Sequence, residues 1–451
     1  MKIIIVGCGK VGFTLTEQLN NEGHDITVID KDGAKLRSVT DNIDVMGVEG
    51  NGAIYQVQIE AGIKNADLLI ATTNSDELNI LCCLIAKKAG NCHTIARIRN
   101  PEYSDEVQYI REELNLSLAI NPELAAAREI ARLLKFPSAI KIDTFASGRV
   151  ELLKFIIPEH SVLHNMPVFE VATKLRCKVL ICAVERGSEV IIPNGSFQMQ
   201  SGDKISFVGS SGDAMEFFRQ VGIKNNVIKS AMFVGGGRLT YYLAKMLENT
   251  RIKIKIVEYD SDRCNELSEL LPKVMIIHGD GSDQQLLMEE GINQTEAFAA
   301  LTGFDEENIM LSLYASTVTK GKLITKINRI AFEEVFQQMN LGSVIHPKLI
   351  IADTIIRYVR AMQNSVGSNV ETLSKIAGNK AEALEFRVEK GTPVAGIPLE
   401  KLSLKDSLLI ACINRRGKII TPRGKDTIEP GDTVIVVTTH SGLNDLKDIL
   451  K

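Results

Sequence analysis

The feature that most constrains the fold of this chain is an internal duplication. The segment Val6–Gly12 aligns with Val234–Thr240, and Asp30 keeps the same spacing from the first segment as Glu258 keeps from the second. Further pairs follow in the same order: Gly50–Gly52 with Gly279–Gly281, Ala71–Asn79 with Ala300–Asn308, Arg97 with Lys326, and Gly202–Asp203 with Gly431–Asp432. The 451 residues therefore contain one unit of roughly 225 residues twice, and we expect two halves of similar fold.

Each unit changes its pattern midway. Its first part alternates short apolar runs with helical patterns: residues 2–6 form a continuous apolar run, residues 11–21 are helical, and residues 25–30 form the next strand. Such alternation predicts a parallel, doubly wound sheet of Rossmann type. The second part, residues 145–223 in the first unit, consists of short strands separated by turn residues and closed by a helix near 213–220. This part predicts a small α+β lobe.

The predicted fold class is therefore α/β, with two Rossmann-like parallel-sheet lobes, each followed by a small α+β lobe. A proline that opens a helix, Pro122 in the first unit and Pro347 in the second, marks the connection between the lobes. We predict six segments: a first Rossmann-like lobe over 1–120, a helix over 121–137, a small lobe over 140–224, a second Rossmann-like lobe over 229–345, a helix over 346–361, and a second small lobe over 368–451.

The first glycine-rich loop predicts a nucleotide site. Gly7, Gly9 and Gly12 follow a buried strand and open a helix, which suits a tight turn, the close approach of a pyrophosphate, and close helix–strand packing, respectively. Phosphates then lie at the start of a helix, where free N–H groups attract anions. Asp30 ends the second strand, where a carboxylate binds ribose hydroxyls and repels a 2′-phosphate, so NAD or ATP is favoured over NADP. The candidate residues are Gly7, Cys8, Gly9, Lys10, Val11, Gly12 and Asp30.

The second loop departs from this pattern at one position. Thr240 replaces the third glycine, which predicts slightly looser helix–sheet packing while the phosphate turn survives. Glu258 keeps the ribose acid. Lys10 and Arg238 follow the second glycine in the two copies, where a cation reaches a terminal phosphate or is simply solvated. The candidate residues of the second loop are Gly235, Gly236, Gly237, Arg238, Leu239 and Glu258.

Further candidates lie at the same predicted sheet edge. Thr73 and Asn74 follow the fourth strand, where such sheets bind ligands, and their polar groups suit a base or a ribose. Arg97 ends the next strand and either meets a phosphate or forms a salt bridge at the sheet edge. Asn51 and Asp280 occupy Gly-Asn-Gly and Gly-Asp-Gly turns, which either hold adenine or only stabilise the turn.

Several function classes are disfavoured by what the sequence lacks. The net charge of −4, from 52 basic and 56 acidic residues, shows no basic excess, so we expect no nucleic-acid partner. The apolar runs are far shorter than the roughly 18 residues of a membrane span, and the chain starts directly on a strand without a cleavable signal. Any role at a membrane must then act through a partner protein.

Catalytic and metal-binding patterns are weak. His160 and His164 lie between two prolines rather than on a metal-binding helix, and the small lobes offer little else as a catalytic acid or base. We therefore expect no enzyme activity. Cys82, Cys83 and Cys92 with the following histidine fit no standard zinc spacing, so we expect buried free thiols and no metal site. An NAD-dependent oxidoreductase remains the alternative from a different class.

Taken together, these motifs resemble the RCK, or KTN, family of potassium-conductance regulators. The residues that carry the resemblance are Gly7–Gly12, Asp30, Gly50–Gly52, Ala71–Asn79 and Ile95–Ile98, each followed at the expected distance by a small lobe. The resemblance covers essentially the whole chain, and two tandem copies are similar to the peripheral cytoplasmic subunits of potassium uptake systems. It implies crossover helices near 122–134 and 347–360.

The resemblance also implies a function. Members of the family bind NAD(H) and ATP or ADP in the Rossmann-like lobes, which carries over to Gly7–Val11, Asp30, Thr73-Asn74, Arg97, Gly235–Leu239 and Glu258. It implies a nucleotide-sensing subunit, located in the cytoplasm at the inner face of the membrane, that gates an integral-membrane potassium transporter subunit. A regulator of another cation channel or transporter fits equally well.

The first helix between the lobes also predicts how chains assemble. Its apolar face comprises Leu124, Ala127, Ile130, Ala131 and Leu134. Such a face must be covered, either by a copy of itself or by its mate in the other unit. We expect a homo-oligomer of two or four chains.

Overall fold

The structure, a computed structural model, describes most of the chain. The described ranges are 1–104, 106–146, 149–175, 177–187, 189–223, 228–329, 336, 339–364, 370–377, 380–440, 442–443 and 445–451. The predicted end of the first small lobe at 224 and the predicted start of the second at 368 lie outside them. Among the described residues, none of the helices is both long enough and apolar enough to cross a membrane.

The first Rossmann-like lobe is a six-stranded parallel sheet with the strand order β3-β2-β1-β4-β5-β6. Its apolar central strand is fully flanked, since β1 pairs with both β2 and β4, which explains why residues 3–6 are buried. The elements are β1 (Lys2–Val6), α1 (Lys10–Asn21), β2 (Asp25–Asp30), α2 (Gly33–Thr40), β3 (Met46–Glu49), α3 (Tyr55–Glu60), β4 (Leu68–Ala71), α4 (Asp76–Gly90), β5 (His93–Arg97), α5 (Pro101–Ser104), α6 (Val107–Glu113) and β6 (Leu118–Ile120).

The second unit repeats this lobe with the equivalent order β14-β13-β12-β15-β16-β17. Its elements are β12 (Ser230–Val234), α10 (Arg238–Leu247), β13 (Lys253–Glu258), α11 (Ser261–Leu270), β14 (Met275–His278), α12 (Gln284–Glu289), β15 (Ala297–Ala300), α13 (Asp305–Val318), β16 (Lys322–Lys326) and β17 (Ser343–Ile345). The predicted doubly wound parallel sheets are thus confirmed in both units.

The small lobes are antiparallel sheets of five strands. The first has the order β10-β9-β11-β8-β7 and the second β18-β19-β22-β20-β21. The elements of the first are β7 (Lys141–Phe145), β8 (Val150–Ile156), α8 (Val168–Lys174), β9 (Leu180–Arg186), β10 (Glu189–Ile191), β11 (Lys204–Gly209) and α9 (Ser211–Gln220). Those of the second are β18 (Val370–Ile376), β19 (Ala381–Arg387), β20 (Leu408–Arg415), β21 (Lys418–Ile420) and β22 (Thr433–Thr438).

The two small lobes end differently. The closing helix near 213–220 is present as α9, whose N-cap is Ser210. In the second unit, Asp445 caps a short 3-10 helix, Leu446–Ile449, near the end of the chain.

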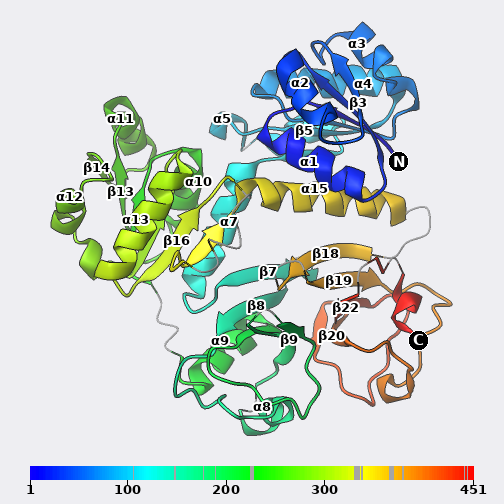
Figure 1. The fold of residues 1–451 in the computed structure, drawn as a ribbon, viewed down its shortest axis with the longest axis vertical. Helices are drawn as coiled ribbons and strands as arrows, with labels where there is room; N and C mark the ends of the chain where they lie inside the picture. The colour runs from blue at the N-terminus through cyan, green and yellow to red at the C-terminus, as the bar shows by residue number, and fades with distance from the viewer. Residues whose placement is uncertain are drawn as a thin grey trace.

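Each crossover helix packs on the Rossmann-like lobe of the other unit. Helix α7 (Pro122–Lys135) lies along α10, and α15 (Pro347–Asn364) lies along α1, as Figure 1 shows for the gold helix beneath the blue lobe. Apolar residues of α15, among them Ile351 and Ile355, share one core with Val11 and Leu15 of α1. The two units are consequently interlocked, because each contributes a helix to the packing of the other.

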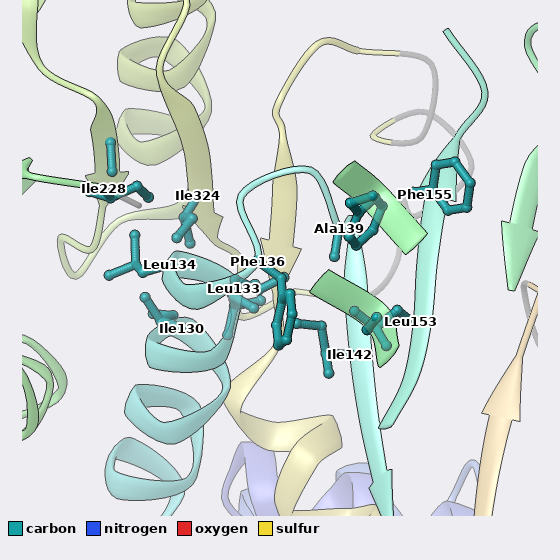
Figure 2. Packing of buried hydrophobic residues seen from close by; sticks show 14 of the residues in the cluster. Ile130, Leu133, Leu134, Phe136, Ala139, Ile142, Leu153, Phe155, Ile228 and Ile324 are labelled. Carbon is teal, nitrogen blue, oxygen red and sulfur yellow. The ribbon is translucent and has the colours of Figure 1, made fainter. Parts of the chain in front are cut away.

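The apolar face predicted for α7 is buried as expected. Ala127, Ile130 and Leu134 are fully or almost fully buried, and the core they join includes Leu243 of α10 and Phe155 of the first small lobe. Figure 2 shows Ile130 and Leu134 beside Ile228 and Ile324 of the second unit, while Phe136, Ile142 and Leu153 extend this packing into the first small lobe. The face is thus covered within one chain by the other unit.

The two small lobes also pack on each other. One core joins residues of both sheets, such as Leu152 and Cys182 from the first with Ala383 and Cys412 from the second. A hydrogen bond from the backbone N–H of Ala146 to Glu385 crosses the contact at 3.0 Å. All eight cysteines of the chain are buried and none is in a disulfide, which confirms the prediction of buried free thiols.

Candidate functional site

Two glycines of the first loop are required by the fold itself. Gly7 has a φ of +101°, and a Cβ there would lie 3.0 Å from the backbone nitrogen of Thr73. A Cβ at Gly12 would lie 1.8 Å from the carbonyl oxygen of Gly7. A side chain at either position would therefore disturb the turn or the seating of α1 on the sheet.

The middle glycines, Gly9 and Gly237, have no such reason to be glycine. Their φ angles of −67° and −66° suit any residue, and a Cβ at either position has no atom of the described chain within 4 Å. Each is the N-cap of its helix, and no side chain caps α1 or α10. Both loops thus leave open space directly in front of helical N–H groups, which attract anions.

The acids at the ends of the second strands are fixed against the loops. Asp30 accepts hydrogen bonds from the backbone N–H groups of Cys8, at 2.6 Å, and Asp32, at 2.9 Å. Glu258 accepts equivalent bonds from Gly236, at 2.5 Å, and Asp260, at 2.8 Å. The longer side chain of the second acid therefore reproduces the geometry of the first. Burial, with Asp30 adding to it, raises the pKa of the Cys8 thiol to about 12, so this cysteine stays neutral.

The second loop keeps its turn despite Thr240. Gly235 has a φ of +98°, close to that of Gly7. Thr240 is fully buried, and its hydroxyl donates a hydrogen bond of 2.5 Å to the carbonyl of Gly235. Because a Cβ at the equivalent Gly12 would lie 1.8 Å from the carbonyl oxygen of Gly7, the two helices cannot be seated identically on their turns. The hydroxyl bond fills the place where the first unit has close backbone contact.

Thr73, Asn74 and Arg97 lie together at the edge of the first sheet. The hydroxyl of Thr73 donates to Asn79 at 2.8 Å, and the carbonyl of Asn74 accepts from Arg99 at 3.2 Å. Arg97 is almost fully buried, and its guanidinium donates to the carbonyl of Thr73, whereas its Nε has no partner among the described residues. The predicted edge salt bridge is therefore replaced by a hydrogen bond to a carbonyl.

Asn51 and Asp280 stabilise their turns. Asn51 accepts a hydrogen bond from the backbone of Ala53 at 3.0 Å, and Asp280 accepts from the backbone and the hydroxyl of Ser282 at 2.8 and 2.7 Å. Both turns touch the end of the central strand, since a Cβ at Gly52 would lie 2.4 Å from the side chain of Val6. They are thus close to the loops, with their side-chain oxygens engaged in turn hydrogen bonds.

One buried asparagine in each Rossmann-like lobe connects the ends of two neighbouring strands. Asn79 is fully buried, accepts from the backbone of Thr73 at 2.7 Å and donates to the carbonyl of Arg97 at 2.9 Å. Asn308 makes the same bonds to Thr302, at 2.8 Å, and to Lys326, at 2.9 Å. The repeat showed both asparagines in the sequence, but only the structure shows that they clamp two strands of the candidate site.

The two loops lie near charges of the opposite unit. Burial is the main cause that lowers the pKa of Arg97 to about 10, and Arg99 and the second loop's Arg238 lower it further. Likewise, burial lowers the pKa of Lys348 on α15 to about 8, with the first loop's Lys10 as the next cause. The loop cations Lys10 and Arg238 are therefore each within electrostatic reach of a cation in the other half of the chain. No sequence pattern had indicated this.

Comparisons with known proteins fit this architecture. The family model described as TrkA-N domain matches residues 3–122 and 231–347, and the TrkA-C domain model matches residues 152–222 and 383–451. A Trk system potassium uptake protein TrkA homolog 1 of Methanosarcina mazei is 31% identical over 460 residues, covering 100% of both chains. The Trk system potassium uptake protein TrkA of Haemophilus influenzae is 31% identical over 445 residues, covering 97% of this chain and 95% of its own.

Solved structures share the fold. A GsuK channel bound to NAD has a TM-score of 0.64 at 14% identity and covers 97% of this chain and 76% of its own. The RCK domain of GsuK has a TM-score of 0.63 at 15% identity and covers 97% and 92%. At these identities the likeness concerns the fold alone. With the family models and the full-length relatives, however, it leads to one conclusion: the chain belongs to the TrkA family of Trk system potassium uptake proteins, with the TrkA-N and TrkA-C domains each present twice.

Proposed function

We propose that this chain is a nucleotide-sensing regulatory subunit, and not an enzyme, that controls potassium flux through an integral-membrane partner similar to TrkH. The chain would act in the cytoplasm, at the inner face of the membrane. The names of its full-length relatives support the potassium uptake system, and the duplicated Rossmann-like lobes support nucleotide sensing.

The observation that carries the proposal is the pair Gly9 and Gly237. In the described chain neither glycine is required by its backbone angles or by a neighbouring atom. Both lie in front of a helix start that no side chain caps. A phosphate that comes close to the backbone supplies the missing reason, because any Cβ would then intrude on the ligand.

The proposed ligands are NAD(H) and ATP or ADP. The acids Asp30 and Glu258, fixed beside the loops, suit ribose hydroxyls and oppose a 2′-phosphate. One solved structure of GsuK, a channel that shares the fold, is named as bound to NAD, and a second structure of GsuK is named as bound to ADP. We propose that the candidate residues of both loops, with Thr73, Asn74, Arg97, Asn51 and Asp280 at the sheet edge, form the two sites.

The interlocked helices supply a mechanism. Because α15 lies on α1 and α7 lies on α10, a ligand that moves a loop also moves the crossover helix of the other unit. A ligand shifts such an arrangement only if it binds one state better. A tenfold difference in affinity amounts to about 1.4 kcal/mol per site, and the two sites of a chain can add their effects. In this mechanism the six predicted segments, namely the four lobes and the two crossover helices, would move relative to one another.

We further propose a homo-oligomer of two or four chains. The apolar face of α7 gives no support for this oligomer, because that face is covered within the chain. Exposed apolar residues at equivalent positions argue for it instead: Leu81 on α4 is 46% exposed and Met310 on α13 is 66% exposed. Light scattering of the purified chain is expected to give a mass of two or four chains, whereas a single-chain mass at micromolar concentration would contradict it.

Calorimetry with two matched variants tests nucleotide binding. Gly9→Val is expected to abolish binding at the first loop and Gly237→Val at the second, each leaving one site active. Because a Cβ meets open space at both positions, both variants are expected to unfold at the same urea concentration as the unmodified chain. Nucleotide affinity that neither variant changes would overturn the proposed sites.

A further inference from the structure

The two crossover helices begin with unlike charges at equivalent positions. In α7 the residue after the opening proline is Glu123, and in α15 it is Lys348. Since α7 packs on α10 and α15 packs on α1, each of these residues is in the first turn of a helix that lies against the helix following the other unit's glycine-rich loop. The repeat therefore changes the sign of one charge between the two candidate sites.

On the side of the second loop, the start of α7 is firmly placed. The amide of its N-cap Asn121 donates to the hydroxyl of Tyr242 on α10 at 3.1 Å, and this hydroxyl donates to the carbonyl of Arg99 at 2.9 Å. Glu123 pairs with Arg99 at 3.6 Å through one oxygen. Its other oxygen is buried and has no hydrogen-bond partner among the described residues. Both Glu123 and the loop residue Arg238 influence the pKa of Arg97: Glu123 raises it and Arg238 lowers it.

On the side of the first loop, a cation takes this place. The ammonium of Lys348 donates to the carbonyl of Asn328 at 2.6 Å. The charged residues that influence the pKa of Lys348 are Lys10, the first residue of α1, together with Asp305 and Arg329. Arg329 itself is paired with Glu306 at 2.8 Å. Lys348 thus lies one turn before Ile351, which shares a core with Val11 of α1, and its ammonium is within electrostatic reach of Lys10.

Three other pairs of equivalent charged residues around the loops agree in sign. Lys10 matches Arg238, Arg97 matches Lys326, and Asp76 matches Asp305. Both aspartates are held by backbone N–H groups after the next strand, at 2.7 to 2.8 Å. Arg99, whose counterpart is the neutral Asn328, is already paired with Glu123. Asn51 with Asp280 and Asn100 with Arg329 also differ in charge, but each of these pairs has one neutral member, whereas Glu123 and Lys348 reverse the sign.

We propose that Lys348 and Glu123 make the two sites unequal toward phosphate charge, so that the first loop prefers ATP over ADP more strongly than the second loop does. This inference rests on the proposed nucleotide function and adds a specificity that the glycine motifs do not contain. A triphosphate carries one more negative charge than a diphosphate, and Lys348 attracts that charge where Glu123 repels it.

Each site can be measured alone. The first site is titrated in the Gly237→Val background and the second in the Gly9→Val background, with ATP and with ADP, by calorimetry. EDTA keeps both nucleotides free of metal ions, which would cancel part of the phosphate charge. The ratio of ATP affinity to ADP affinity is expected to be at least about fivefold higher at the first site.

Charge variants assign the effect to the two residues. Lys348→Gln is expected to lower the ratio at the first site, Glu123→Gln to raise it at the second, and Lys348→Arg to keep the original value. Lys320→Gln is the matched control, since this exposed lysine precedes β16, at the end of the strand away from the loops. Urea unfolding of each variant checks that the fold is retained.

The outcomes separate this inference from the proposed function. Equal ratios at the two sites, or a ratio that Lys348→Gln leaves unchanged while both nucleotides still bind, would overturn the inference and leave nucleotide sensing intact. Binding of neither nucleotide to the unmodified chain would overturn both. A first-site ratio that falls in Lys348→Gln but not in Lys348→Arg or Lys320→Gln supports the inference.

Discussion

At the scale of single residues, we propose that the acid at the end of the second strand decides which dinucleotide is accepted. Asp30→Asn is expected to weaken NAD binding at the first site by about tenfold or more, the effect of losing a hydrogen bond to a charged group, and to narrow the gap to NADP. Calorimetry in the Gly237→Val background measures the affinity of the first site for NAD and for NADP. Asp25→Asn, at the opposite end of β2, is the control and should change neither affinity. Equal affinities for NAD and NADP in the unmodified first site would contradict the role of Asp30.

The third glycine position tests how the two loops differ. Gly12→Ala is expected to cost about 3 kcal/mol or more of unfolding free energy, because its Cβ would meet the carbonyl of Gly7 at 1.8 Å. Thr240→Ala removes one hydrogen bond where a Cβ is already accommodated, so we expect a cost of about 1 kcal/mol. Urea unfolding compares the two. A smaller cost for Gly12→Ala than for Thr240→Ala would refute the described packing.

At the scale of elements, the junction between the units contains a lysine that responds to pH. Lys322 starts β16, is half-buried, and donates to the carbonyl of Ala139 between α7 and β7. Burial lowers its pKa from 10.5 to about 7. Between these values the unfolded chain binds a proton that the folded chain has lost, so this residue makes the fold more stable as the pH rises from 7 toward 10.

Removing this ammonium is expected to flatten that dependence. Lys322→Met should gain less stability between pH 7 and pH 10 than the unmodified chain, measured as the urea midpoint at several pH values. Lys320→Met, two residues earlier and exposed, serves as the control and should keep the original dependence. If Lys322→Met and the unmodified chain show the same dependence on pH, the ammonium is not desolvated as described.

The elements themselves could largely be predicted from the sequence. The apolar run at 2–6 and the glycines after it give β1 and α1, because strand burial and loop geometry are local properties. The partner of α15 could not be predicted in this way. Its apolar residues show that a face must be buried, but the choice of α1 of the other unit depends on how two lobes meet in space.

The same limit applies to the candidate site. The repeat identifies Asp30 and Glu258 as equivalent acids, while their bonds to the loop N–H groups need the folded turn. Lys348 and Glu123 lie more than 100 residues from the loops that they face, so no spacing rule connects them. Asn79 was visible only as part of a repeated segment, since its role depends on two neighbouring strands.

At the scale of the whole molecule, the chain holds two complete units that exchange their crossover helices and pack their small lobes together. The helix after each glycine-rich loop therefore contacts the other half of the same chain, and the proposed coupling would use this contact without a second protein. This arrangement suits a subunit that compares two nucleotide signals. It also explains why the account is best tested on the full chain with its membrane partner, and not on an isolated lobe.

The most direct test of the central claim is potassium flux in vesicles that contain the membrane subunit and the purified chain. We predict that NADH and ATP change the flux, that Gly9→Val removes the part due to the first site, and that Gly237→Val removes the part due to the second. Vesicles without the chain control for direct effects of the nucleotides. A flux that the unmodified chain leaves the same with NADH, with ATP and without nucleotide would contradict the account.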